Sequence, residues 1–97
     1  MIVEKEEVTE FDMSDYLDSD EAIAEYITQV LADGDTKEFL RAISYIARAK
    51  GMTEVSKETG LSRASLYKTL DENAKPRFET IMKILKSFCI RLEATYG

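Results

Sequence analysis

The sequence predicts an all-α fold of five helices, and three observations support this prediction. Apolar residues recur at intervals of three and four in several separate segments, as they do on the buried face of a helix. Glycines and small polar residues stand at the ends of these segments, where helices begin and stop. A length of 97 residues suits one domain, 1–97, with a modest hydrophobic core.

The first expected helix covers residues 19–33. Asp18 and Glu21 have the spacing of a capping box at its start, and Gly34 is expected to end it. Its expected buried face contains Ile23, Tyr26, Ile27, Val30 and Leu31.

The second expected helix begins at Asp35, with Glu38 three residues further on, and Gly51 closes it. The three-and-four spacing again marks one apolar face along this segment. That face contains Phe39, Leu40, Ile43, Ile46 and Ala47.

Three shorter helices are expected over residues 53–59, 63–71 and 78–88. The last of them is expected to bury Phe78, Ile81, Met82, Leu85 and Phe88. Apolar and polar residues alternate from Ile90 to Tyr96, which predicts a short C-terminal strand. A lone strand needs a partner, which would be the N-terminal arm or a second subunit.

Charge is distributed unevenly along the chain. Residues 1–36 contain 12 acidic residues and one basic residue, whereas residues 37–97 contain 12 basic and 7 acidic residues. We treat residues 1–18 as an acidic N-terminal arm. DNA would repel the first part of the chain and attract the second, so a net charge of −6 does not argue against a nucleic-acid partner.

The composition argues against an enzyme. The chain has no histidine, which removes the commonest general base and the commonest metal ligand. Its single cysteine, Cys89, allows no intramolecular disulfide and is expected to be a small buried residue. We therefore expect no catalytic residues, no cofactor and no metal. No apolar run approaches the roughly 20 residues that cross a bilayer, and the first residues lack the features of a signal peptide, so we expect a cytoplasmic protein.

Residues 52–71 predict a helix-turn-helix, in which two short helices are joined by a tight turn. Gly60 supplies the positive φ that such a turn needs. The hydroxyl of Ser62 can cap the second helix. Val55 and Leu66 are expected to face each other across the pair.

In this motif the second helix enters the major groove of DNA with its N-terminal end nearest the bases. Arg63 could there donate a bidentate pair of hydrogen bonds to guanine, whereas Lys75 and Arg77 suit phosphate contacts. The residues expected to contact DNA are Thr53, Ser62, Arg63, Ala64, Ser65, Tyr67, Lys68, Lys75 and Arg77. The alternative is that the basic residues form only a solvated helix face.

Two parts of the chain carry a resemblance to known families. A resemblance to the XRE (phage-repressor/Cro) class lies in G-L-S-R-A-S-L-Y-K-T-L followed by N-A-K-P-R-F-E-T-I-M-K-I-L-K. It implies a lambda-repressor-like DNA-binding domain. A resemblance to HigA-like antitoxins, the probable addiction-module antidote family, lies in F-D-M-S-D-Y-L-D-S-D-E-A-I-A-E-Y-I and D-G-D-T-K-E-F-L-R-A-I-S-Y-I-A-R-A-K-G-M. Together these resemblances cover about residues 11–92.

The resemblance implies an antitoxin that neutralises a RelE/HigB-type ribonuclease toxin encoded beside it. It also implies that a homodimer represses the shared operon at a palindromic operator. Such toxins tend to be basic, so the acidic first third would be a complementary surface. Four apolar residues among these acids could anchor the contact, or else pack on the domain's own core. These residues are Phe11, Met13, Tyr16 and Leu17.

The chain departs from the broad XRE pattern at two positions. Met52 stands where a glutamine often contacts a phosphate, which weakens one expected DNA contact. Thr59 replaces a common apolar residue, which suggests a locally looser core. Two other functions stay open: a stand-alone phage-type repressor without a toxin, and a protein-interaction module that has lost DNA binding.

Overall fold

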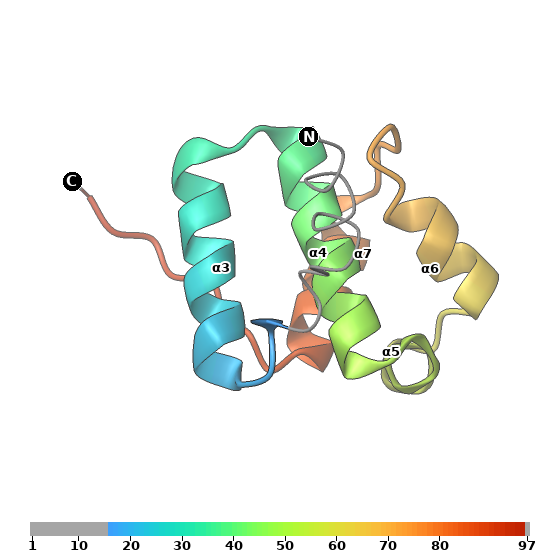
Figure 1. Ribbon diagram of the computed structural model, residues 1–97. Coiled ribbons are helices and arrows are strands. Elements are labelled where there is room, and N and C mark those ends of the chain that lie inside the picture. The colour runs from blue at the N-terminus through green and yellow to red at the C-terminus, as the bar shows by residue number, and fades with distance from the viewer. Residues whose placement is uncertain (1–15, 97) are drawn as a thin grey trace, which may run out of the picture.

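A computed structural model describes residues 16–96, and this part of the chain contains five α-helices and no strand (Figure 1). The helices are α3 (Asp20–Asp33), α4 (Thr36–Lys50), α5 (Met52–Thr59), α6 (Arg63–Thr69) and α7 (Phe78–Ser87). The predicted all-α fold is confirmed. Each expected helix agrees with an observed one to within two residues at either end.

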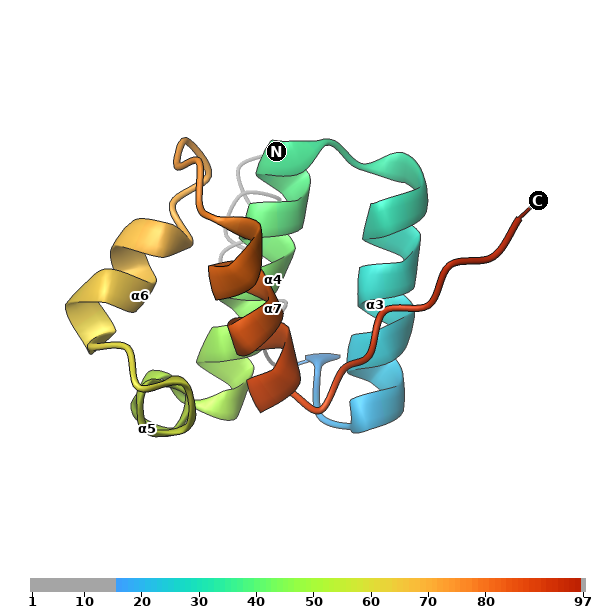
Figure 2. The same ribbon diagram turned by 180° about the vertical axis from the view of Figure 1, so that it is seen from behind.

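α3 and α4 lie side by side and run in opposite directions (Figure 1). α7 packs against α5 and passes behind α4, and α6 lies at the edge of the molecule opposite α3 in both views (Figures 1 and 2). An ion pair of 3.2 Å between Lys50 Nζ and Asp20 Oδ1 joins the C-terminal end of α4 to the first turn of α3. Each charge lies at the helix end whose dipole favours it.

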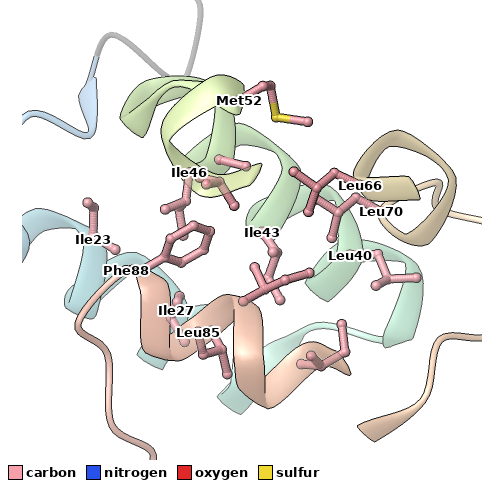
Figure 3. Packing of buried hydrophobic residues seen from close by; sticks show 14 of the residues in the cluster. Ile23, Ile27, Leu40, Ile43, Ile46, Met52, Leu66, Leu70, Leu85 and Phe88 are labelled. Carbon is pink, nitrogen blue, oxygen red and sulfur yellow. The ribbon is translucent and has the colours of Figure 1, made fainter. Parts of the chain in front are cut away.

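One hydrophobic core connects all five helices (Figure 3). Its largest fully buried side chains are Phe88, Ile27, Leu40, Ile43, Ile46, Leu66, Ile84 and Leu85. Each of these side chains contributes roughly 1.5–3 kcal/mol to folding by leaving water. Leu66 extends from α6 into this core, so the position of α6 is set by packing and not only by the preceding turn.

The helix starts agree with the prediction at α4 and differ from it at α3. At α4, Asp35 Oδ1 accepts a hydrogen bond of 2.9 Å from the backbone N–H of Glu38, as predicted. At α3 the cap is Ser19 and not Asp18, because Ser19 Oγ accepts a hydrogen bond of 3.1 Å from the backbone N–H of Ala22. Ser19 has the extended backbone that an N-cap residue adopts.

Two apolar residues are exposed although the sequence predicts them to be buried. Phe78 is 73% exposed and Leu31 is 52% exposed. Phe78 is the first residue of α7, and Leu31 lies in the last turn of α3. The buried residues of α7 begin only at Ile81 and those of α3 end at Ile27, so each exposed residue lies beyond the covered part of its helix.

The predicted C-terminal strand is wrong. The backbone N–H groups of Cys89 and Ile90 donate hydrogen bonds to the carbonyls of Lys86 (2.9 Å) and Leu85 (3.1 Å), which ends α7. Cys89 has φ 63° and is exposed, so its predicted burial is also wrong. From Ile90 to Tyr96 the chain passes beside α3 without a strand partner within residues 16–96 (Figure 2). A strand is defined by its pairing, and sequence alternation does not provide a partner.

Candidate nucleic-acid interface

The turn between α5 and α6 consists of Gly60, Leu61 and Ser62. Gly60 has φ 80° and ψ 3°, which lies in the left-handed region that glycine adopts with little strain. Its backbone N–H donates a hydrogen bond of 2.9 Å to the carbonyl of Ser56, and this bond closes α5. The predicted role of Gly60 is therefore confirmed.

Two hydroxyl groups of α5 hold the turn in this conformation. Thr59 Oγ1 donates a hydrogen bond of 2.7 Å to the carbonyl of Val55 and accepts one of 3.2 Å from the backbone N–H of Leu61. Ser56 Oγ donates a hydrogen bond to the carbonyl of Leu61. Thr59 is buried and its hydroxyl is satisfied, so the predicted looser core at this position is wrong. A polar residue is useful here because an apolar one could not bind the turn.

Apolar contacts fix α6 against α5. Val55 and Leu66 are buried in the same cluster, which agrees with the expected packing of the pair. Leu70 belongs to this cluster too, beside Leu66 (Figure 3). Leu61 is partly buried against that cluster. Leu66 of this seven-residue helix and the C-cap residue Leu70 are buried, whereas the other positions of the helix are exposed except Thr69, which is partly buried.

The first turn of α6 is capped by a side chain. Ser62 Oγ accepts a hydrogen bond of 3.0 Å from the backbone N–H of Ser65, as predicted, and donates one of 3.1 Å to the Ser65 hydroxyl. The exposed side chains of this helix are Arg63, Ala64, Ser65, Tyr67 and Lys68. Two of them are cations, and the helix has no acidic residue. Tyr67 is 53% exposed, so its ring is accessible and not part of the core.

The loop after α6 presents two further cations. Lys75 and Arg77 are both exposed, and Arg77 directly precedes α7. The start of the loop is held by a hydrogen bond of 2.8 Å from the backbone N–H of Asn73 to the side chain of Asp71.

An ion pair connects this loop to α4. Arg41 Nη2 lies 2.8 Å from Glu72 Oε1, and both side chains are about half exposed. The hydrogen bond to Glu72 and the negative charge of its carboxylate raise the pKa of Arg41 above its ordinary value. Glu72 is thus occupied by Arg41 and does not neutralise the cations that follow it in the loop.

The first turn of α5 holds one predicted DNA contact and one departure from the family pattern. Thr53 is exposed, as a contact to DNA requires. Met52 is buried in the core, so its side chain replaces a polar contact with packing (Figure 3). Every residue that the sequence predicts to contact DNA lies at an exposed position of α5, α6 or the loops that flank α6.

The predicted partner-binding residues separate into three groups. Tyr16 is 63% exposed. Leu17 is 6% exposed and packs in the core, so it does not form an accessible anchor. Phe11 and Met13 lie outside the described residues.

Several structural features bear on other kinds of function. Within residues 16–96, no group of three or more carboxylate or thiol side chains is arranged to hold a metal ion. None of the helices in the same range is long and apolar enough to cross a membrane.

The sequence analysis missed one surface residue near the candidate interface. Phe78, next to Arg77, is exposed, although the helical spacing of apolar residues predicts it to be buried.

These features define a small all-α protein with a helix-turn-helix-like pair, α5 and α6, in which α6 exposes Arg63 and Lys68 and has no acidic residue. The chain belongs to the family described as "Probable addiction module antidote protein", whose model matches residues 7–96. It is also similar to an uncharacterized protein of Haemophilus influenzae (strain ATCC 51907 / DSM 11121 / KW20 / Rd), with 33% identity over 88 residues that cover 91% of each chain. No solved structure matches the chain. Membership of an antidote family implies a regulatory protein with a toxin partner of some kind.

Proposed function

We propose that this protein is the antitoxin of a type II toxin–antitoxin module and a sequence-specific repressor of its own operon. Its partners would be a basic RelE/HigB-like ribonuclease toxin and, as a homodimer, a palindromic operator. The observation that carries the proposal is the exposed, cation-bearing face of α6, held by the Gly60 turn in a chain of the antidote family. In this role the protein acts by binding and needs no catalytic residue.

The geometry of α6 supports an XRE-type reading of the major groove. A recognition helix contacts base edges mainly through its N-terminal residues, and Arg63 is the first residue of α6. An arginine there can donate two parallel hydrogen bonds to guanine O6 and N7. Lys75 and Arg77 lie in the loop that follows, where they suit contacts to the phosphate backbone.

The acidic side of the molecule supports a basic protein partner. α3 carries Asp20, Glu21, Glu25 and Asp33 and no basic residue. This helix lies at the edge of the molecule opposite α6 (Figures 1 and 2). A basic toxin would be attracted to the edge formed by α3, and DNA would be attracted to the edge formed by α6. One chain could therefore bind both partners without competition for the same surface.

The proposed DNA binding is tested by fluorescence anisotropy with a labelled fragment of the gene's own upstream region. A scrambled duplex of equal length serves as competitor, and the salt concentration is varied. We expect tight, competitor-resistant binding that weakens steeply with salt. Absence of binding at low salt would mean that α5 and α6 serve only a structural role.

Two variants of Arg63 distinguish hydrogen bonding to bases from the non-specific effect of a positive charge. Arg63→Ala should reduce discrimination between operator and scrambled duplex by roughly 1–3 kcal/mol. Arg63→Lys keeps the positive charge but loses the planar fork, so it should retain non-specific affinity and still lose discrimination. If Arg63→Lys discriminates as well as the natural protein, α6 does not read bases through this residue.

The proposed neutralisation of a toxin is tested by co-expression of the protein with the neighbouring reading frame. Growth arrest by that frame should be relieved by the natural protein and equally by Arg63→Ala, because neutralisation does not need the DNA-reading face. Absence of a toxin-sized neighbour would favour a stand-alone repressor. Neutralisation without any salt-sensitive DNA binding would favour an interaction module that has lost the DNA function.

A further inference from the structure

Residues 71–80 connect α6 to α7 and contain no buried side chain. We call this stretch, which includes the first three residues of α7, the α6–α7 connection. The residues on either side of it, Leu70 and Ile81, are 5% and 7% exposed and belong to the core. Apolar burial therefore fixes the two ends of the connection but not the part between them.

The backbone hydrogen bonds of the connection are local. The N–H groups of Asn73 and Ala74 donate to Asp71, at 2.8 Å to its side chain and at 2.9 Å to its carbonyl. Such bonds do not attach the connection to any helix other than the two that it joins. In the described part of the chain, one hydrogen-bonded ion pair does reach a third helix, with 2.8 Å between Arg41 Nη2 and Glu72 Oε1.

The helix at the other end of this ion pair is firmly held. Arg41 lies on α4 between Leu40 and Ala42, which are both buried in the protein. The connection lies at the end of the molecule where α4 begins, in both views (Figures 1 and 2). The ion pair thus attaches a weakly packed part of the chain to a well-packed one.

We propose that Glu72 is a positioning residue for DNA binding, because its ion pair with Arg41 holds the α6–α7 connection where Lys75 and Arg77 can meet the phosphate backbone. This inference rests on the proposed function and adds to it an acidic residue that does not contact DNA itself. A connection that is ordered before binding does not have to lose its conformational freedom when the duplex arrives. Phosphate contacts then form with less loss of affinity.

This role can be recognised by the sign of its effect. An acidic residue near DNA repels the duplex, so its removal should strengthen binding if charge alone matters. Removal of a positioning residue should weaken binding, although the protein becomes less negative. An exposed ion pair contributes little to overall stability, so the fold itself should persist in either case.

The test compares Glu72→Ala with Glu79→Ala by fluorescence anisotropy, with the labelled upstream fragment and the scrambled duplex as ligands. Glu79 is an exposed acidic residue of the same connection and makes no ion pair in the described part of the chain. Glu72→Ala should weaken binding to both duplexes by roughly twofold to tenfold, because phosphate contacts do not depend on sequence. Glu79→Ala should bind as tightly as the natural protein or more tightly.

A measurement without DNA tests the positioning directly. The ¹⁵N order parameters of the backbone amides of residues 73–75 and 77 should fall in Glu72→Ala from about 0.85 toward about 0.6, the range of a flexible backbone. The double variant Arg41→Glu/Glu72→Arg exchanges the two charges and should restore these order parameters. Glu72→Arg alone opposes two arginines and should not restore them. A general loss of folding would not be reversed by the exchange.

Each result decides the role of Glu72. Glu72→Ala that binds DNA as tightly as the natural protein, or order parameters that do not change, would overturn the positioning role and leave the proposed function intact. A natural protein that binds neither duplex would overturn the proposed DNA function and this inference together. Weaker binding by Glu72→Ala, unimpaired binding by Glu79→Ala and recovery of order in the exchanged pair would together establish it.

Discussion

The hydroxyl of Thr59 accepts a hydrogen bond of 3.2 Å from the backbone N–H of Leu61. Through this bond, the last residue of α5 holds the residue after the glycine of the turn. The same hydroxyl donates to the carbonyl of Val55, so one side chain satisfies backbone groups of both the helix and the turn. The direction in which α6 leaves α5 therefore depends on a polar atom in an otherwise apolar region.

Thr59→Val should lower the free energy of unfolding by about 1–3 kcal/mol, because it keeps the shape of the side chain but leaves the Leu61 N–H without its partner. Urea unfolding measures this change. Thr53→Val is the matched control, since Thr53 is exposed on the same helix, and it should shift stability by no more than about 0.5 kcal/mol. Equal effects of the two changes would show that the Thr59 hydroxyl does not stabilise the turn.

Gly60→Val should destabilise the protein by more than about 1 kcal/mol, because a β-branched residue resists the positive φ at this position. A Cβ atom added here would meet no atom within 4 Å, so the loss would come mainly from the backbone conformation. Gly60→Asn should be milder, since asparagine tolerates the left-handed region. Thermal melts of the two variants compare them directly, and a similar melting temperature for both would contradict a conformational origin.

Two changes at Ser62 should separate helix capping from DNA binding. Ser62→Ala removes the cap on the N–H of Ser65 and should cost about 1 kcal/mol of stability. Ser62→Asp keeps an acceptor and should preserve the stability, but it adds a negative charge beside the proposed phosphate and base contacts. The aspartate variant should therefore fold normally and bind DNA weakly. Unchanged DNA affinity in this variant would place the duplex away from the start of α6.

Lys75→Ala should weaken binding to all DNA sequences alike and reduce the slope of log affinity against log salt by about 0.9, the value for one lost phosphate contact. Lys86→Ala removes an equal charge from the opposite end of α7 and should leave the slope nearly unchanged. Anisotropy titrations at several salt concentrations give both slopes. A loss confined to the operator sequence would assign Lys75 to base reading.

Most helix boundaries could be predicted because their signals are local. Asp35 binds a backbone N–H three residues away, and Gly51 and Gly60 adopt positive φ at the ends of α4 and α5. These conformations follow from the chemistry of the residue itself. The cap of α3 differed by one residue, because Asp18 and Ser19 are both good capping residues and the sequence does not select between them.

The remaining errors concern contacts between distant parts of the chain. The exposure of Phe78 depends on where the neighbouring elements stop, and helical spacing alone carries no such information. The strand expected from Ile90 onward needed a partner that the described chain does not supply. For the candidate site, the exposed positions of α6 followed from the inward direction of Leu66 and Leu70, whereas the ion pair between Arg41 and Glu72 joins positions 31 residues apart and has no local signal.

The opposed charges of α3 and α6 separate negative from positive charge across the part of the molecule formed by residues 16–96, which gives this part an electric dipole. The acidic residues of α3 lie at one edge, and Arg63 and Lys68 of α6 lie at the other (Figure 1). In the field of a duplex, such a dipole experiences a torque that turns α6 toward the DNA before contact. A protein with a net charge of −6 can thus be oriented by a polyanion that repels it as a whole, and the fraction of productive collisions would depend on ionic strength even where the final contacts do not change.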